Sequence, residues 1–250
     1  MDVVIALVTA GMGALLLHRM RQPARALDTV FDSDAEVVLH VAGHEARTRG
    51  EIPSSLHVLY GLLQDEAIVT AIRDAGGDPD TLEDQVLAAL DARLRNDEVR
   101  DDDDIQRVTG YAVGHAQNVG RRASSRDLWA YLRFSDAAAL LETKPASLAA
   151  VLFRLCHESA EPELTAIGTA DVHVVLRNDD YTTQEFVCEI LREVFGLSAE
   201  QASVRMLETH TQGRSVAGRL RPEDARTRIE EVRSRAHAAG FPLWIGIEPT

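Results

Sequence analysis

Apolar residues recur at helical spacing from residue 30 to residue 158. The stretch DSDAEVVLHVAGHEARTRG has Ser33 as a candidate N-cap and carries apolar positions close to the helical period. In SSLHVLYGLLQDEAIVTAIRDAGG, Ser54 and Ser55 are candidate caps and two glycines stop the helix; DPDTLEDQVLAALDARL follows as another capped helix. The pattern predicts an all-helical domain over residues 30–158.

Part of this helical pattern occurs twice. GHEARTRGEIPSSLHVLYGLL (43–63) aligns with GHAQNVGRRASSRDLWAYLRF (114–134) if one gap is placed near Pro53, which gives a period of 70 to 71 residues. A tandem repeat of a helix-loop-helix unit usually forms two halves that bury a common core. The acidic stretch from Asp97 to Asp104, between the two copies, is most simply a solvated linker.

Residues 159–170 are predicted to form a linker, and the pattern of apolar and polar positions changes after them. DVHVVLR alternates like a strand, and two capping boxes, Thr182 with Glu185 and Ser198 with Gln201, each introduce a helix. RSVAGRL, PEDARTRIEEVRSRAHAAG and FPLWIGIEP then predict a strand, a helix and a last strand. The expected fold class is therefore α+β: an all-α tandem-repeat helical domain followed by a small β-α-α-β-α-β domain over residues 171–250.

Residues 1–29 form an apolar N-terminal segment. The run VVIALVTAGMGALLL (3–17) is uncharged but shorter than the ~20 residues of a usual membrane span. It has neither a basic stretch before it nor a clear cleavage site, so a cleaved signal peptide fits poorly. Two interpretations stay open, an inner-membrane anchor and a buried helix. The arginines that follow the run favour a cytoplasmic location for the globular body in either case.

Composition limits the classes of partner. The net charge is -14 and Lys144 is the one lysine, so binding of nucleic acid through phosphates is not expected. The two cysteines, Cys156 and Cys188, fall in different predicted domains, which suggests free thiols. His40 and His44 have zinc-pair spacing, but Val41 stands where a zinc protease needs glutamate and no third ligand is evident. No metal, cofactor or catalytic activity is expected.

Two family resemblances organise these observations. The double helical unit of residues 30–158 resembles the Clp repeat domain, the helical N-terminal domain of Clp unfoldases. The segments VVLRNDDYTTQEFV, RMLETHTQGRSVAG, PEDARTRIE and PLWIGIEP cover nearly all of residues 171–248 and closely resemble ClpS. ClpS proteins are adaptors that recognise N-terminal residues of proteins and deliver them to a Clp protease. The chain contains no GxxxxGK[ST] phosphate loop, so an ATPase module does not follow.

The resemblance implies a binding site for N-terminal degradation signals that begin with Leu, Phe, Tyr or Trp. A free α-amino group is mostly a cation at neutral pH, and it requires converging acceptors such as an amide oxygen, a carboxylate and an imidazole nitrogen. The resemblance assigns Asn178, Asp179 and His210 to this amine. It assigns the pocket for the first side chain to Leu176, Asp180, Thr182, Gln184, Val187, Met206, Thr209 and Leu243.

Several alternatives stay open for this site. Asn-Asp-Asp in front of a helix would, by itself, also be a capped turn. Gln184 replaces a usual Met and Thr209 a usual Val, so we expect retained binding of aromatic or Leu N-termini with a changed ranking. If these changes abolish the pocket, the alternative function is a membrane-tethered interaction scaffold that binds partners through the Clp-repeat domain.

The resemblance also implies a partner, a Clp-type AAA+ unfoldase. Glu223 and Arg228 lie on PEDARTRIE, at positions that touch the unfoldase's N-terminal domain in the family. A solvated helix face with i,i+4 pairs is the structural alternative. Because family members dock onto a Clp N-terminal domain, the two domains of this chain could also dock on each other.

Overall fold

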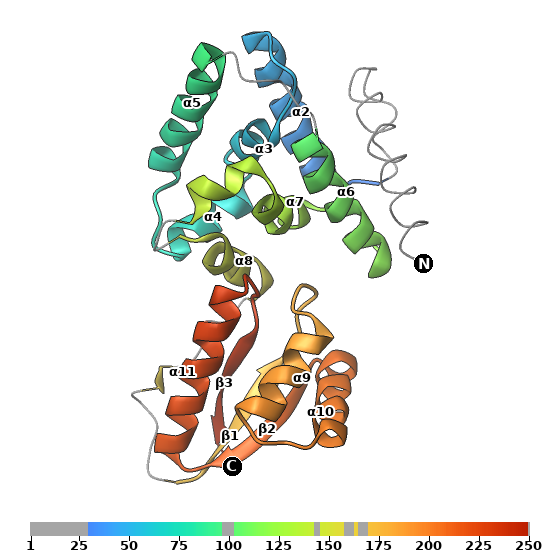
Figure 1. Cartoon of the computed structure of the whole chain (residues 1–250), viewed down its shortest axis with the longest axis vertical. Coiled ribbons are helices and arrows are strands. Elements are labelled where there is room, and N and C mark those ends of the chain that lie inside the picture. Colours follow the sequence, from blue (N-terminus) through green and yellow to red (C-terminus); the bar gives the residue numbers. More distant parts are fainter. Residues whose placement is uncertain (1–29, 97–102, 143–145, 158–162, 165–169, 250) are drawn as a thin grey trace. The chain divides into compact units, whose positions relative to one another are not determined.

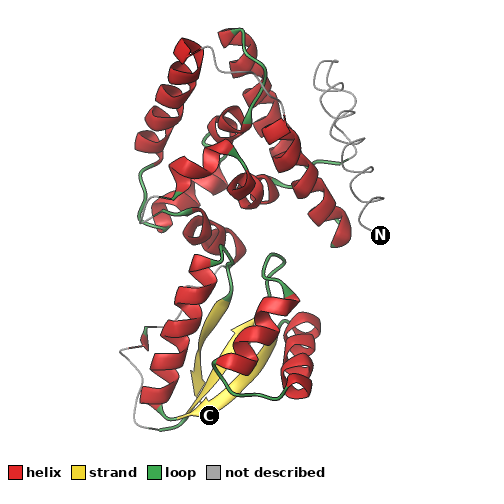
Figure 2. Ribbon diagram, viewed as in Figure 1, coloured by secondary structure: helices red, strands yellow, loops and turns green. Residues whose placement is uncertain are grey.

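The structure, a computed structural model, describes residues 30–96, 103–142, 146–157, 163–164 and 170–249. Contacts between residues divide the chain into two compact units, Met1–Val151 and Leu152–Thr250, which we call the helical unit and the sheet unit. The helical unit contains helices and the sheet unit combines helices with a three-stranded sheet (Figures 1 and 2). The expected α+β fold class is confirmed.

The helical unit contains most of the described helices. Two of them, η1 and η2, are 3-10 helices, and the last helix, α8, spans the division between the units. In chain order the elements are α2 (Ser33–Arg49), α3 (Ser55–Leu62), α4 (Glu66–Asp74), α5 (Pro79–Asn96), α6 (Asp103–Asn118), α7 (Ser125–Tyr131), η1 (Leu132–Phe134), η2 (Asp136–Leu141) and α8 (Leu148–Cys156).

The internal repeat is visible in the way corresponding helices end. Gly50 follows α2 and Gly120 follows α6, and both adopt a left-handed backbone, with φ of 71° and 74°. After each glycine a backbone amide reaches back to an alanine carbonyl, Glu51 to Ala46 at 2.8 Å and Arg121 to Ala116 at 2.9 Å. These equivalent positions are 70 residues apart, so the gap expected near Pro53 is wrong: the helix-ending glycines fix one period throughout.

The next helix of each repeat begins with the same cap. Ser54 precedes α3 and Ser124 precedes α7, and each forms a capping box with the side chain three residues later, His57 or Asp127. The alignment of the serine pairs therefore corresponds to equivalent positions in the fold. At the start of α2, however, Asp32 is the cap in place of the expected Ser33, because its carboxylate accepts the Ala35 amide at 2.9 Å.

The two repeats share one interior. A short parallel bridge joins Phe31 to Ala123, with two backbone hydrogen bonds of 2.9 Å. Asp104 accepts hydrogen bonds from the Ser55 hydroxyl at 2.5 Å and the Ser55 amide at 3.2 Å, and it is only 4% exposed. The expectation of a solvated linker extending to Asp104 is therefore wrong, because Ser55, 49 residues earlier, supplies this carboxylate with buried donors.

The sheet unit has the expected β-α-α-β-α-β order. Its strands lie in the order β2-β1-β3, and β1 pairs antiparallel with both neighbours. The elements are β1 (Val172–Arg177), α9 (Gln184–Glu193), α10 (Ala199–Gln212), β2 (Arg214–Leu220), α11 (Pro222–Ala238) and β3 (Trp244–Pro249).

One face of this sheet packs on the three helices. Val174 and Leu176 of β1 and Ile245 of β3 are fully buried in one apolar cluster together with residues of α9, α10 and α11. The helix residues at its centre are Ile190, Leu191, Ala202, Ala225, Ile229 and Val232. The alternation of β1 therefore directs every second side chain into the core, and the turn that follows β1 emerges at the edge of this core.

Two predictions concern other segments. The apolar run 3–17 lies outside the described residues, and within the described ranges no helix is long and apolar enough to cross a membrane. His40 and His44 both lie exposed on α2. Over the part of the chain that the structure describes, His, Cys, Asp and Glu do not form a group of three or more that could hold a metal ion.

Candidate functional site

The turn after β1 is attached to the end of α10. Asn178, the first residue after β1, donates its backbone N–H to the carbonyl oxygen of Gly213 at 2.9 Å. Gly213 ends α10 in a left-handed conformation with φ of 78°, which favours glycine. Because His210 lies on the last turn of α10, this hydrogen bond brings the Asn178 turn close to the histidine's helical turn.

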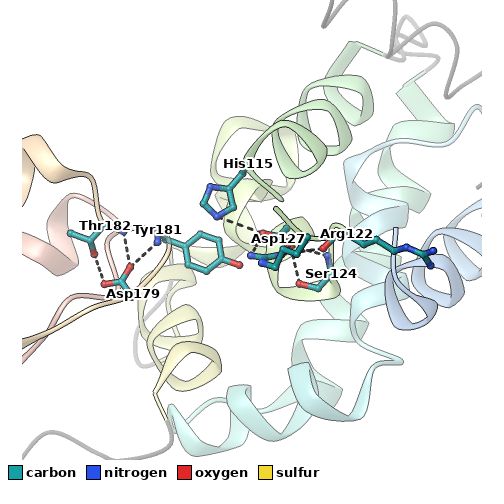
Figure 3. A network of polar contacts seen from close by, with 8 residues as sticks. His115, Arg122, Ser124, Asp127, Asp179, Tyr181 and Thr182 are labelled. Carbon is teal, nitrogen blue, oxygen red and sulfur yellow. Dashed lines mark hydrogen bonds and ion pairs between the residues drawn. The ribbon is translucent and has the colours of Figure 1, made fainter. Parts of the chain in front are cut away.

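Asp179 organises the turn from within. Its carboxylate accepts the backbone amides of Tyr181 at 2.8 Å and Thr182 at 2.6 Å, and the Thr182 hydroxyl at 2.7 Å (Figure 3). The Asp179 carboxylate therefore stabilises the turn. It can also bind a ligand only if one of its oxygens is still accessible to a further donor. Asp179 is half-buried, and no basic side chain forms an ion pair with it within the described ranges.

The same contacts correct the expected start of α9. Thr182 is occupied by Asp179, so its predicted capping box with Glu185 does not form. Thr183 is the cap instead, and its hydroxyl accepts the Phe186 amide at 3.3 Å. The helix therefore begins one residue later than the sequence pattern indicates, and Gln184 becomes its first residue and lies exposed.

Helix α10 presents the other half of the site. The predicted capping box of Ser198 and Gln201 is confirmed. Met206 and His210 are four residues apart and share a face; Met206 is half-buried, while His210 is exposed. An exposed imidazole is accessible to a ligand, which distinguishes His210 from a histidine satisfied in the core.

Thr209 faces inward and uses its hydroxyl within the protein. It is 3% exposed, and its Oγ1 lies 2.9 Å from the Arg205 carbonyl oxygen and 2.6 Å from Ser215 Oγ. Since the carbonyl can only accept, the Thr209 hydroxyl donates to Arg205 and the Ser215 hydroxyl donates to Thr209. This buried pair joins α10 to β2, and it leaves Thr209 no hydroxyl proton to offer to a ligand.

The apolar residues assigned to the pocket all belong to the core of the sheet unit or pack against it. Leu176, Val187 and Leu243 are 0%, 6% and 3% exposed and belong to the same core cluster, against which Met206 packs. Asp180 is exposed, and Thr182 is half-buried beside Asp179. These apolar residues are therefore core residues of the same unit that carries the Asn178 turn and the end of α10.

The expected unfoldase-contact residues are placed differently from each other. Glu223 is exposed in the first turn of α11. Arg228 is half-buried, and its guanidinium donates to the Val194 carbonyl oxygen at 3.1 Å, beyond the end of α9. Five residues on a helix separate the two side chains by about 140° around the axis, so they do not lie on one face.

Two residues of the site were not identified from the sequence. Gly213 anchors the Asn178 turn, and Ser215 satisfies Thr209. A glycine between a predicted helix and a predicted strand is a recognisable helix-ending signal. The Ser215 partnership has no such signal, because it depends on how β2 lies against α10.

Comparisons with known proteins concern this same part of the chain. The family model described as "ATP-dependent Clp protease adaptor protein ClpS" matches residues 169–246. The ClpS adapter protein of Desulfatibacillum aliphaticivorans is 50% identical over 76 residues, which are 30% of this chain and 73% of that protein. The ClpS of Neisseria gonorrhoeae is 47% identical over 75 residues, 30% of this chain and 72% of the relative.

A solved structure is also similar. Agrobacterium tumefaciens ClpS2, bound to L-phenylalaninamide, is 34% identical, and the match covers 33% of this chain and 100% of that one with a TM-score of 0.32. The family is established by the sequence relatives, since their matches cover most of the length of those adaptors. Through residues 169–246, this chain belongs to the ClpS family of ATP-dependent Clp protease adaptors.

Proposed function

We propose that the sheet unit binds proteins by a free N-terminal α-amine followed by a large apolar side chain, and delivers them to a Clp-type AAA+ unfoldase. The observation that carries this proposal is the hydrogen bond from the Asn178 amide to the Gly213 carbonyl oxygen. It holds the Asn178–Asp179 turn beside the last turn of α10, which carries His210. Membership in an adaptor family, as opposed to an enzyme family, supports the same function.

The polar groups suit a primary ammonium ion. Such an ion has three N–H donors, and the turn and the helix end supply an amide oxygen, a carboxylate and an imidazole nitrogen as acceptors. Asp179 already accepts three hydrogen bonds, but a carboxylate has about four lone-pair positions, so it can take one more donor. Its negative charge is then compensated by the ligand.

The apolar residues suit the first side chain. Leu176, Val187 and Leu243 belong to one apolar core and Met206 packs against it, and burying a Leu or Phe side chain contributes about 2 to 3 kcal/mol. Of the two departures from the family pattern, Thr209 keeps its hydroxyl within the protein. We therefore assign the change in selectivity to Gln184, which is exposed at the start of α9.

We further propose that delivery uses α11, through Glu223, and that the helical unit is a Clp-repeat domain. The duplicated caps and the uniform 70-residue register support a tandem helical repeat in that unit. Arg228 contributes its charge on the same helix while its guanidinium donates to the Val194 carbonyl oxygen at the end of α9. The body of the protein would then act in the cytoplasm, where Clp unfoldases are found.

Fluorescence anisotropy on the full chain tests amine recognition. Labelled peptides that differ only in the first residue, Leu, Phe, Tyr, Trp or Arg, are titrated with the parent chain and with Asn178→Ala and His210→Ala. His44→Ala is the matched control, because His44 is an exposed histidine on a helix of the other unit. A hydrogen bond to a charged group is worth about 1.5 to 3 kcal/mol, so each site variant should lose about 10- to 100-fold in affinity.

The pattern of results separates the parts of the proposal. We expect tight binding of the apolar first residues, weak binding of Arg and no effect of His44→Ala. A Gln184→Met variant should change the ranking among the apolar residues and not the dependence on His210. Equal binding of all five peptides by all variants would contradict the proposal.

A further inference from the structure

A second surface, on the helical unit, is unrelated to the amine site. We call it the aromatic surface; it consists of Arg107, Tyr111 and His115 of α6, Tyr131 of α7, and Arg133 and Phe134 of η1. The three α6 residues follow one another at intervals of four and therefore lie on one helix face. Tyr111 lies 5.8 Å from the ring centroid of Tyr131 and 5.2 Å from that of Phe134.

Two rings of this surface remain accessible, while Tyr131 and His115 are half-buried. Tyr111 is 49% exposed and Phe134 is 45% exposed, which is unusual for side chains of this size in contact with each other. The Arg133 guanidinium carbon lies 4.9 Å from the Phe134 ring centroid and 5.6 Å from that of Tyr131. Arg107 is exposed one helical turn before Tyr111. Aromatic and cationic groups are thus combined on one surface.

The first repeat has no counterpart of this surface. At positions 70 residues earlier it carries Val37, Val41, Glu45, Gly61, Leu63 and Gln64. The difference is largest at Gly61, where a Cβ would come within 2.4 Å of the Val38 carbonyl oxygen, so that α2 and α3 leave no space for a side chain. The equivalent position holds Tyr131. The aromatic surface is therefore not something that the repeat needs in order to fold.

The surrounding charge favours a negatively charged partner. Residues 30–96 contain 13 Asp and Glu and 5 Arg, whereas residues 103–157 contain 5 Asp and Glu and 7 Lys and Arg. Within residues 103–157, Asp104 and Asp127 are buried and hydrogen-bonded inside the protein, so they offset less of this positive charge, whereas Asp103, Asp136 and Glu142 are exposed. In a chain of net charge -14, residues 103–157 thus carry an excess of basic residues that favours acidic groups, while residues 97–102 directly before them add four acids and one arginine.

From this combination we propose that the aromatic surface is a docking site for an acidic peptide segment of a partner protein, anchored by one large apolar side chain. Tyr111, Tyr131 and Phe134 receive the apolar anchor, while Arg107 and Arg133 face the carboxylates on either side of it. Exposed aromatic and arginine side chains are the residue types that contribute most to protein interfaces. Opposite charge fixes the register and accelerates association.

The probe is a short labelled peptide rich in Asp and Glu with a central Phe, acetylated at its N-terminus. Acetylation removes the α-amine, so the peptide lacks the group proposed to bind near His210. Anisotropy titrations compare the full chain with Tyr111→Ala, Phe134→Ala and Arg107→Glu. Val37→Ala is the matched control, since Val37 is 60% exposed on α2 at the position equivalent to Arg107. Circular dichroism verifies that each exposed-site variant is folded.

We expect saturable binding that weakens as salt is raised, with a loss of about 10-fold or more in Tyr111→Ala and Arg107→Glu and no change in Val37→Ala. A peptide with Ala in place of Phe, and one with Lys in place of the acids, should bind weakly. Absence of binding, or equal binding of the Ala peptide, would overturn the proposal. So would concentration-dependent dimerisation that Tyr111→Ala abolishes, because the occupant would then be a second copy of the chain.

Discussion

Asp127 in the helical unit and Asp179 in the sheet unit are two carboxylates with similar local roles and different surroundings (Figure 3). Each accepts backbone N–H groups near the start of a helix: Asp127, in the first turn of α7, accepts from Ser124 at 2.8 Å, and Asp179, in the turn before α9, accepts from Tyr181 and Thr182. Asp127 is fully buried and paired with Arg121. Asp179 is half-buried and has no ion pair within the described ranges.

The comparison indicates where charge serves structure and where it is available to a ligand. Burial alone would raise the pKa of Asp127, but hydrogen bonds from Arg121 and Ser124 hold that pKa below its usual value. Its charge is therefore neutralised within the protein. The Asp179 carboxylate, by contrast, can still be neutralised by a cation from outside, as amine recognition requires.

The same contrast exists between the two repeats of the helical unit. Asp127 corresponds to His57, and Arg121 corresponds to Glu51, so the two positions exchange acid and base. His57 still completes the capping box, because its Nδ1 accepts the Ser54 amide at 3.1 Å. The cap is thus completed by a neutral imidazole in the first repeat and by a carboxylate in the second, and the facing group differs as well.

The largest effect is expected for Asp127→Ala. The substitution removes a cap and leaves Arg121 without its carboxylate, so we expect a loss of about 4 kcal/mol in the unfolding free energy of the helical unit.

The matching variant in the sheet unit is Asp179→Ala, which should lower the unfolding free energy of that unit by about 1 kcal/mol and abolish peptide binding. Urea unfolding measures both through the two tryptophans, Trp129 in the helical unit and Trp244 in the sheet unit, each in a variant with the other changed to Phe. Similar losses of stability in both units would contradict the comparison.

Acid should destabilise the first repeat through His57. Burial, followed by the charges of Arg49 and Arg93, lowers the pKa of His57 from 6.5 to about 4. Between these values the unfolded chain binds the proton and the folded chain does not, so the unfolding free energy falls as the pH drops from 6.5 towards 4. The total loss is about 3 kcal/mol.

The His57→Gln variant is the control for this pH effect. Glutamine at the same position can complete the capping box but does not titrate. Urea unfolding from pH 7 to pH 4, followed by Trp129 fluorescence, should show a shallower loss of stability in the variant. Parallel pH profiles for the two proteins would assign the acid sensitivity to other groups.

Close packing of α2 and α3 should make Gly61→Ala destabilising. The new Cβ would lie 2.4 Å from the Val38 carbonyl oxygen, so the helices must separate, at a cost of about 2 kcal/mol. Gly110→Ala in α6 is the matched control, because a Cβ there meets nothing within 4 Å. That control should be neutral or stabilising by up to about 1 kcal/mol. Thermal unfolding that ranks the two variants in the opposite order would contradict the close approach of α2 and α3 at Gly61.

The smallest effect on peptide affinity is expected at Thr209, within the sheet unit. Thr209→Val leaves the buried Ser215 hydroxyl without its acceptor and should cost about 1 to 2 kcal/mol. Adding Ser215→Ala should restore most of this loss, since both partners are then apolar. Peptide affinity should change little in the double variant. A large change in the ranking of first residues would instead assign selectivity to Thr209.

Much of the fold could be predicted from local patterns. The α+β class, the strand and helix order after residue 170 and the Ser198 capping box depend on spacing within a few residues. The strand order β2-β1-β3 could not, because alternation marks a strand without identifying its neighbours. The acidic pattern predicts a linker as far as Asp104, and local spacing cannot correct this because the burial of Asp104 depends on Ser55, 49 residues away.

The candidate site shows the same limit at closer range. The sequence and the family resemblance placed Asn178 and His210 in one site, and the Asn178–Gly213 hydrogen bond brings their segments together. The cap of α9 was predicted at Thr182, whereas the structure uses Thr183, since Asp179 takes the Thr182 hydroxyl first. Two neighbouring threonines have the same capping chemistry, and only the geometry of the turn selects between them.

The most direct test of amine recognition is a single pair of titrations on the full chain at neutral pH. Two labelled peptides share one sequence that begins with Phe, and one of them is acetylated at its N-terminus. Acetylation removes a cation and its hydrogen bonds while the Phe side chain stays the same. We expect the free peptide to bind roughly 100-fold more tightly. Equal affinities would contradict the account, because Asn178, Asp179 and His210 would then not bind an amine.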